Sequence, residues 1–205
     1  MMEKLTVYLV DDDPGVLKAL SRLLRAKGYD VKPYSSPQVF LEEHDVALPG
    51  CAVLDVSMPG LDGLELQRAL TTSVRSHRPV VFVTGKGDIP TSVRAMKAGA
   101  IDFLTKPVKD EDLFDAICRA EDKDAQSRRA HSELASIQAK IGTLTPRERE
   151  VLLHVVAGRL NKQIAGDLGT VEKTIKVHRS RMMEKLGVRN VADLVRMAEK
   201  LNLAK

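Results

Sequence analysis

The chain has 205 residues with 43% hydrophobic and 29% charged side chains and a formal net charge of +4, so it is long enough for two domains with buried cores. No apolar run approaches the ~20 residues of a membrane-spanning helix, and the acidic N-terminal region excludes a typical secretory signal peptide. Two cysteines argue against a disulfide-rich secreted scaffold and favour a reduced cytoplasm, and the absence of tryptophan argues against stacking platforms for single-stranded nucleic acid.

The positive charge is concentrated in the last third of the chain. Residues 1–121 have a net charge of −3, residues 122–141 of +1 and residues 142–205 of +6. A basic region behind a mildly acidic one predicts two domains, of which the second faces a polyanion. We therefore expect an N-terminal domain over 1–121, a linker over 122–141 and a C-terminal domain over 142–205.

Short apolar runs in the N-terminal region predict strands, and segments of helical periodicity separate them. The predicted strands cover residues 5–10, 29–34, 51–55, 79–84 and 100–107. The predicted helices cover residues 14–28, 37–43, 64–72, 89–99 and 109–120. Pro33 places the second strand at a sheet edge or marks its end. Five such pairs predict an α/β domain, a five-stranded parallel sheet with helices on both faces.

The linker is predicted to continue the preceding helix, because residues 121–140 are polar and contain neither glycine nor proline. Leu134, Ile137, Ile141 and Leu144 recur at 3-4-3 spacing. This stripe either caps the core of the second domain or forms a short dimer seam. The first interpretation is favoured, since a coiled-coil seam needs ~3–4 heptads.

The C-terminal region is predicted to be all-helical, with helices over 145–158, 161–169, 170–187 and 190–203. Thr145 and Glu148 form a capping-box pattern around Pro146. The second and third helices are joined by a tight turn that contains glycine, and the third is strongly basic. This pattern is typical of a helix-turn-helix.

Polar side chains stand where the predicted strands end. Asp11 and Asp12 follow the first strand, Asp55 the third, Thr84 the fourth and Lys106 the fifth. Function gathers at this edge of a parallel sheet. Converging carboxylates repel each other, and a hard cation such as Mg²⁺ relieves the repulsion. Any one aspartate is best explained as an ordinary loop residue, but the whole set predicts phosphoryl transfer onto a carboxylate.

The third C-terminal helix has two distinct faces. Ile175, Met182 and Leu186 share an inward face. The outward face mixes charge, a small apolar group and a hydroxyl, as the readout of base edges requires. A solvated amphipathic helix would be the preferred explanation if this helix stood alone. The outward and edge positions of this helix are Lys173, Lys176, Val177, Ser180 and Arg181. Three further positions are suited to phosphate contacts, namely Arg179 on the same helix and Lys162 and Gln163 on the preceding one.

Four motifs in the N-terminal region resemble the receiver domain of two-component response regulators: VDDD (10–13), LDVSMPGLDG (54–63), VTGKGD (83–88) and DFLTKP (102–107). The resemblance implies a doubly wound, flavodoxin-like fold with Asp55 as the phospho-acceptor. It also implies Asp12 as a direct Mg²⁺ ligand, Asp11 as a ligand through water and the backbone carbonyl of Ser57 as a further ligand.

The same resemblance assigns the remaining residues of the predicted site. Thr84 and Phe103 correspond to a switch pair, and Lys106 corresponds to the residue that contacts the phosphoryl group. Pro107 is expected to follow a cis peptide bond, and Gly85 leaves the phosphoryl group accessible.

The segments LTPREREVLLHVVAG, NKQIAGDLG and TVEKTIKVHRSRMMEKLG resemble the LuxR-type four-helix DNA-binding domain, and the whole chain resembles response regulators of the FixJ/NarL subfamily. One departure is the pair Thr170-Val171, since relatives often carry Ile or Leu followed by a Ser or Thr helix cap at these two positions. The DNA-binding residues that the resemblance implies are Lys162, Gln163, Lys173, Thr174, Lys176, Val177, Arg179, Ser180 and Arg181.

The resemblance implies a cytoplasmic transcription regulator without membrane attachment and without an enzymatic reaction on an outside substrate. It further implies that a cognate sensor histidine kinase phosphorylates Asp55 and that the face over about 89–105 then dimerises. The dimer is expected to bind double-stranded promoter DNA and to act on RNA polymerase, more often as an activator. Two alternatives stay open. One is a Mg²⁺-dependent phosphatase or phosphotransferase, which leaves the basic domain unexplained. The other is a DNA-binding protein with a vestigial receiver, which leaves the intact acidic set unexplained.

Overall fold

The computed structural model describes residues 5–72, 78–201 and 203. It divides into two compact units, Met1–Arg128 and Arg129–Lys205. The strands are β1 (Thr6–Val10), β2 (Asp30–Tyr34), β3 (Gly50–Leu54), β4 (Val80–Thr84) and β5 (Asp102–Thr105). The helices are α1 (Pro14–Ala26), α2 (Pro37–Glu43), α3 (Gly63–Thr72), α4 (Ile89–Lys97), α5 (Asp110–Gly142), α6 (Pro146–Val156), α7 (Asn161–Asp167), α8 (Glu172–Leu186) and α9 (Val191–Lys200).

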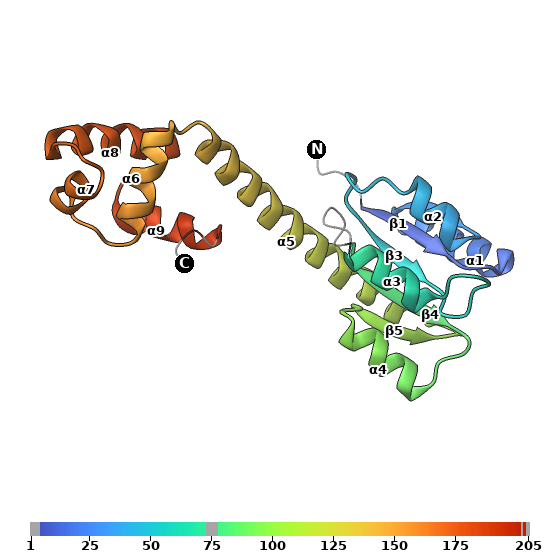
Figure 1. Cartoon of the computed structure of the whole chain (residues 1–205). Helices are drawn as coiled ribbons and strands as arrows, with labels where there is room; N and C mark the ends of the chain where they lie inside the picture. The colour runs from blue at the N-terminus through green and yellow to red at the C-terminus, as the bar shows by residue number, and fades with distance from the viewer. Residues whose placement is uncertain (1–4, 73–77, 202, 204–205) are drawn as a thin grey trace. The chain divides into compact units, whose positions relative to one another are not determined.

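The first unit contains a five-stranded parallel sheet in the order β2-β1-β3-β4-β5 (Figure 1). The alternation of strands and helices predicted this architecture. β2 is an edge strand, where the missing N–H of Pro33 is tolerated. β5 is shorter than the predicted strand over 100–107, since only Asp102–Thr105 pair with β4.

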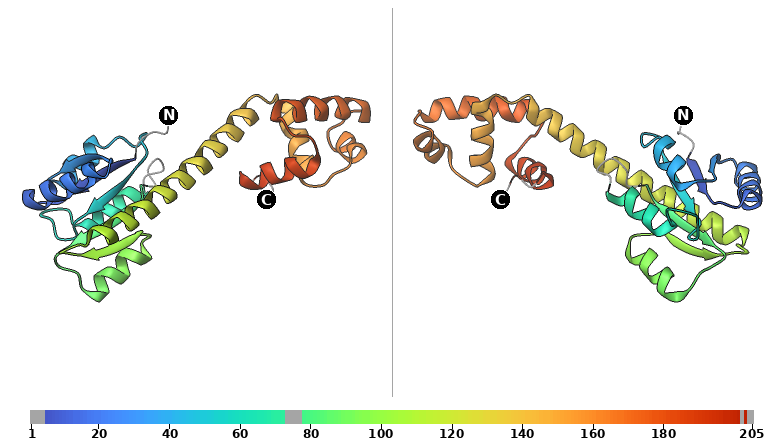
Figure 2. Two further views of the ribbon diagram at one scale, coloured as in Figure 1. Left: turned by 180° about the vertical axis from the view of Figure 1, so that it is seen from behind. Right: turned by 45° about the vertical axis from the view of Figure 1, so that its right-hand side comes forward.

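Alternation along the strands sends successive side chains to opposite faces of the sheet. Val7 and Leu9 enter one core, which side chains of α1 and α5 complete. Tyr8 and Val10 enter the other core, which side chains of α2, α3 and α4 complete. Both faces are therefore buried, and polar groups at strand ends stand out against an apolar interior. Figure 2 shows the sheet between its two helical layers from two further sides.

α5 is a single helix of 33 residues that continues beyond the first unit. Asp124, a buried residue of α5, accepts hydrogen bonds from the backbone N–H of Gly50 at 3.2 Å and from Nε of Arg128 at 2.7 Å. Arg128 also donates to the backbone carbonyls of Ala47 and Leu48. These bonds fasten α5 to the loop that enters β3.

The second unit is built from helices. Its core joins Ile137 and Ile141 of α5 to side chains of α6, α7, α8 and α9. Leu144 packs against the same core. Most of the predicted stripe on the linker therefore caps the core of the C-terminal unit, as the favoured interpretation held. None of the helices that the structure describes combines the length and apolar character needed to cross a lipid bilayer.

Candidate functional site

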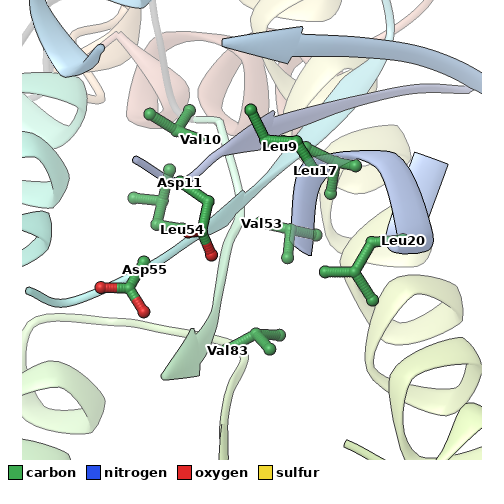
Figure 3. A pocket seen from close by; sticks show the side chains of 9 residues that line it. All are labelled: Leu9, Val10, Asp11, Leu17, Leu20, Val53, Leu54, Asp55 and Val83. Carbon is green, nitrogen blue, oxygen red and sulfur yellow. The ribbon is translucent and has the colours of Figure 1, made fainter. Parts of the chain in front are cut away.

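Two carboxylates and one ammonium group meet at the carboxyl edge of the sheet. Nζ of Lys106, just after β5, lies 2.6 Å from Oδ2 of Asp11 and 3.0 Å from Oδ1 of Asp55. Both aspartates are about 5% exposed. A small pocket lies beside them; Figure 3 shows Asp11 and Asp55 with the seven apolar side chains that complete its lining. An ion pair in apolar surroundings is screened less than one at the surface.

The charges of this cluster perturb one another. Burial raises the pKa of Asp11 and the neighbouring Asp55 adds to this, which outweighs the lowering effect of Lys106. For Lys106, burial lowers the pKa, but the hydrogen bonds to the two carboxylates outweigh burial and raise it. Lys106 is therefore held as a cation, while Asp11 resists ionisation more than an ordinary aspartate does.

Asp12 differs from its neighbour, because its side chain is exposed. Among the residues that the structure describes, no group of three or more His, Cys, Asp or Glu side chains is arranged to hold a metal ion. The structure thus brings together two of the three predicted carboxylates. The oxygen donors of Asp11 and Asp55 still suit a hard cation such as Mg²⁺ in their chemistry.

Hydrogen bonds and close packing fix Asp55 and the loop that follows β3. The backbone N–H of Asp55 donates to the carbonyl of Val10 at 2.9 Å. The backbone N–H of Ser57 donates to Oδ2 of Asp55, and the side chain of Ser57 is exposed. A Cβ at Gly63 would lie 2.2 Å from the carbonyl oxygen of Asp55, so only glycine fits at the start of α3. The final glycine of LDVSMPGLDG thus serves the packing of this loop.

The predicted switch residues lie on adjacent strands. Thr84 is fully buried at the end of β4, and its hydroxyl accepts a hydrogen bond from the backbone N–H of Lys86 at 3.2 Å. Phe103 is half-buried on β5, with its ring centroid 5.8 Å from that of Phe82. The Lys106–Pro107 peptide bond is cis, as the resemblance implied.

α4 carries an apolar stripe on its exposed side. Ile89, Val93 and Met96 are 80%, 44% and 44% exposed. Their spacing along the helix places them on one face. Exposed apolar side chains that gather on one face, beside β5, are typical of a surface for protein–protein contact.

The basic helix α8 has the two faces that its sequence predicts. Ile175, Met182 and Leu186 are buried in the core of the second unit. Five of the seven predicted DNA-binding residues on α8 are exposed, and Thr174, like Arg179, is half-buried. The exposed ones are Lys173, Lys176, Val177, Ser180 and Arg181.

Several predicted contacts already have partners within the protein. Nζ of Lys176 lies 3.1 Å from Glu172, one helical turn earlier. Arg179 donates to Asn161 of α7 at 2.9 Å, which ties the two helices of the predicted helix-turn-helix together. The side chain of Gln163 accepts from the backbone N–H of Leu160 at 2.8 Å, so it caps α7. Lys162 is exposed near the start of the same helix.

Val171 is the N-cap residue of α8, and it makes no side-chain capping bond. Its side chain is 65% exposed. The departure from a Ser or Thr cap therefore leaves the first turn of α8 without the usual side-chain acceptor. The backbone carbonyl of Val171 still accepts from Thr174 at 3.0 Å.

Sequence reasoning missed the role of Asp13. Oδ1 of Asp13 accepts from the backbone N–H groups of Gly15 at 2.7 Å and Val16 at 3.2 Å, so the third acid of VDDD caps α1. The proline that follows it at Pro14 is the signal that could have identified this cap. The acidic run thus divides into a buried carboxylate, an exposed one and a helix cap.

Comparisons with known families match both units. The model of the response regulator receiver domain matches residues 7–118. The model of the bacterial regulatory proteins of the luxR family matches residues 142–198. The first covers the strands that present Asp11 and Asp55, and the second covers the basic helix.

Individual relatives match over nearly the full chain. Nodulation protein W of Bradyrhizobium diazoefficiens is 41% identical, with 98% of this chain and 88% of that protein covered. The transcriptional regulatory protein FixJ of Rhizobium meliloti is 40% identical over 96% of both chains. Among solved structures, the response regulator StyR has a TM-score of 0.83 at 46% identity, with 96% of this chain and 99% of that chain covered.

Proposed function

Because the chain belongs to the two-component response regulators, which here join a receiver to a LuxR-type DNA-binding domain, we propose that Asp55 is its site of phosphorylation. The single observation that carries this is the position of Asp55, which is buried at the carboxyl edge of the sheet with its Oδ1 3.0 Å from Nζ of Lys106. In this proposal residues 1–121 receive the phosphoryl group, 122–141 link the domains and 142–205 bind DNA.

The phosphoryl donor is a phosphohistidine of a cognate sensor histidine kinase. A carboxylate oxygen of Asp55 attacks the phosphorus, the P–N bond breaks, and the imidazole nitrogen takes the bond's electron pair and is protonated. Mg²⁺ held by Asp11, Asp12, Asp55 and the carbonyl of Ser57 would neutralise charge on the phosphoryl oxygens. The ammonium group of Lys106 already lies 3.0 Å from the accepting carboxylate and pairs with the new anion.

The switch acts through Thr84. When the hydroxyl of Thr84 donates to a phosphoryl oxygen, its side chain moves toward Asp55 and loses the hydrogen bond from the N–H of Lys86. The ring of Phe103 then moves into the space that Thr84 leaves. The loop before α4 then shifts the exposed apolar stripe of Ile89, Val93 and Met96. Two receivers bury these stripes against each other, and the dimer gains affinity for a pair of half-sites.

The proposed DNA contacts fall into two groups, those to base edges and those to phosphates. Lys176, Val177 and Ser180 read base edges in the major groove, and Lys173, Thr174 and Arg181 support them. Lys162, Gln163 and Arg179 contact phosphates, which position the helix without specifying a sequence. Promoter DNA, RNA polymerase and a cytoplasmic location complete the proposal, with activation as the favoured outcome.

The deciding experiment is labelling with acetyl phosphate that carries radioactive phosphorus, in the presence of Mg²⁺. Asp55→Asn should lose the acid-stable, base-labile label of an acyl phosphate. Asp115→Asn, which changes an exposed aspartate of α5, serves as the matched control and should be labelled like the parent. Retention of the parent's labelling in Asp55→Asn would exclude Asp55 as the acceptor.

A second candidate function, DNA binding without phosphorylation, is separated by binding to promoter DNA with and without acetyl phosphate. Equal affinity in both conditions supports a vestigial receiver. Tighter binding with the donor, lost in Asp55→Asn, supports the proposal.

A further inference from the structure

The loop between β4 and α4 is fastened at both ends. At its start, the hydroxyl of Thr84 accepts from the backbone N–H of Lys86 at 3.2 Å. At its end, the side chain of Asp88 caps α4 by accepting from the backbone N–H of Thr91 at 2.7 Å. Gly87 lies between these two bonds, so its backbone has little freedom to yield.

Gly87 is in close contact with the half-buried ring of Phe103. A Cβ built at this position would lie 2.9 Å from Cε1 of Phe103 and 3.6 Å from Cζ, and 3.2 Å from Cγ2 of Thr105. The first distance is shorter than side chains tolerate without movement. Gly85, two residues earlier, would bring a Cβ no closer than 4.0 Å to Lys106. Of the two glycines in this loop, only Gly87 is therefore crowded.

The backbone itself does not demand glycine at position 87. Its φ lies outside the left-handed region, unlike that of Gly60 or Gly99. The absence of a side chain thus has one structural effect here, which is to leave room for the ring of Phe103 and the methyl group of Thr105. The ring is the group that yields most readily, because it swings as a unit about the Cα–Cβ bond.

We infer that Gly87 is a positioning residue of the phosphorylation switch. Because it has no side chain, it leaves room for the ring of Phe103 to occupy its present place while Asp55 is unmodified. This inference rests on the proposed function. A methyl group at position 87 expels the ring from this place. It therefore favours the arrangement that phosphorylation of Asp55 otherwise produces.

The position of the ring can be followed directly. The chain has four phenylalanines, so full-length protein labelled with 4-fluorophenylalanine gives four ¹⁹F resonances, and Phe103→Leu assigns one of them. In the parent, acetyl phosphate with Mg²⁺ should move the Phe103 resonance. In Gly87→Ala without a phosphoryl donor, the resonance should already lie toward that moved position. The ratio of the two ring positions should change roughly tenfold, the effect expected of one overpacked methyl group.

A second readout tests whether the ring mediates the effect. Sedimentation of the unphosphorylated protein should show roughly tenfold tighter dimerisation for Gly87→Ala than for the parent, by the same overpacking estimate. In the Phe103→Leu background, Gly87→Ala should change dimerisation little, because the shorter side chain lacks the crowded ring atoms. Gly142→Ala is the matched control, since a Cβ there meets nothing within 4 Å. Thermal unfolding of each variant checks that the fold is kept.

The outcomes separate the inference from the function on which it rests. If the parent's Phe103 resonance does not respond to acetyl phosphate, both the switch and the role of Gly87 are overturned. If the parent responds but Gly87→Ala behaves like the parent, or keeps its effect when Phe103 is leucine, only the role of Gly87 is overturned. A shift in Gly87→Ala that Phe103→Leu abolishes supports the inference.

Discussion

Lys106 donates a hydrogen bond of 2.6 Å to Asp11, although two strands separate the strands that these residues follow. β3 and β4 lie between β1 and β5, so the residues that follow β1 and β5 converge over the carboxyl edge of the sheet. The bond joins opposite sides of the site across Asp55. β1 itself carries no positive charge, so this bond supplies the cation that accompanies the buried carboxylate of Asp11.

The substitution Asp11→Asn should raise the free energy of unfolding at pH 7 by about 1 kcal/mol, because it removes one of two neighbouring buried carboxylates. The folded-state pKa of Asp11 is raised, so its ionisation opposes folding at neutral pH. The gain should therefore disappear as the pH falls toward about 4, where an unfolded aspartate is itself protonated. Denaturant unfolding at several pH values measures this, and Asp12→Asn, at an exposed site, is the control. Destabilisation of Asp11→Asn at pH 7 would mean that the bond to Lys106 outweighs the repulsion.

The uncapped first turn of α8 offers a stabilising substitution. Val171→Ser should raise the stability of the C-terminal unit by about 1 kcal/mol, since a hydroxyl at the N-cap satisfies a free backbone N–H group. Hydrogen exchange of the α8 amides in the full chain measures the change. Val177→Ser, also exposed on α8 but in mid-helix, should bring no such gain. Unchanged protection in Val171→Ser would show that the cap is satisfied in another way.

Glu148 closes the capping box of α6 and is only 3% exposed. Its carboxylate accepts from Lys185 at 2.6 Å and from the backbone N–H of Thr145 at 2.9 Å, and these bonds lower its pKa. Glu148→Gln should destabilise the C-terminal unit by about 2 kcal/mol, the cost of losing hydrogen bonds to a charged group. Glu150 forms an ion pair with Arg147 at 2.8 Å on the surface of the same helix, so Glu150→Gln, the control, should cost less than about 1 kcal/mol.

The pH dependence gives a second test of Glu148. A lowered pKa in the folded state means that its stabilisation is present above about pH 4.3, the unfolded value, and is lost as the pH falls through the folded-state pKa. Protection of the α6 and α8 amides from hydrogen exchange should fall over this range in the parent. Glu148→Gln should show a weaker dependence, and an equal dependence in both proteins would contradict the role of this carboxylate.

The DNA-binding residues should separate in their response to salt. Lys162→Ala should lower the slope of log affinity against log salt by about 1 and weaken all DNA sequences alike, because it removes a phosphate contact. Val177→Ala should leave the slope unchanged and alter the preference among operator sequences. Binding titrations over a range of salt concentrations, with two operator variants, distinguish these effects. A change in the salt slope for Val177→Ala would contradict the assignment of Val177 to the base edges.

The order of strands and helices could be predicted from sequence, because apolar residues recur with a period of 2 in strands and 3.6 in helices. The strand-end rule then located Asp11, Asp55, Thr84 and Lys106. It could not locate bonds between polar groups that are far apart in the chain, such as that of Asp124 with Gly50 or those of Arg128 with Ala47 and Leu48, because no periodicity encodes them. The exposure of Asp12 also escaped prediction, since neighbouring residues of one loop turn in directions that local sequence does not fix.

Arg78 illustrates the same limit. Its guanidinium lies 4.3 Å from the centre of the Tyr8 ring, and its Nη2 donates to the carbonyl of Asp45 at 2.8 Å. Burial lowers the pKa of this arginine. A buried arginine before a strand looks like a surface residue in sequence, and only the folded chain brings the aromatic ring and the carbonyl to it.

The burial of Ile137 and Ile141 bears on how this architecture can be cut and recombined. The luxR family match begins at residue 142, yet the hydrophobic core beneath it already uses both isoleucines of α5. A fragment that starts at residue 142 would expose that core. A gene fusion that exchanges receivers would have to carry the end of α5 along with the DNA-binding helices. The unit that can be inherited intact is therefore longer than the unit that sequence similarity outlines.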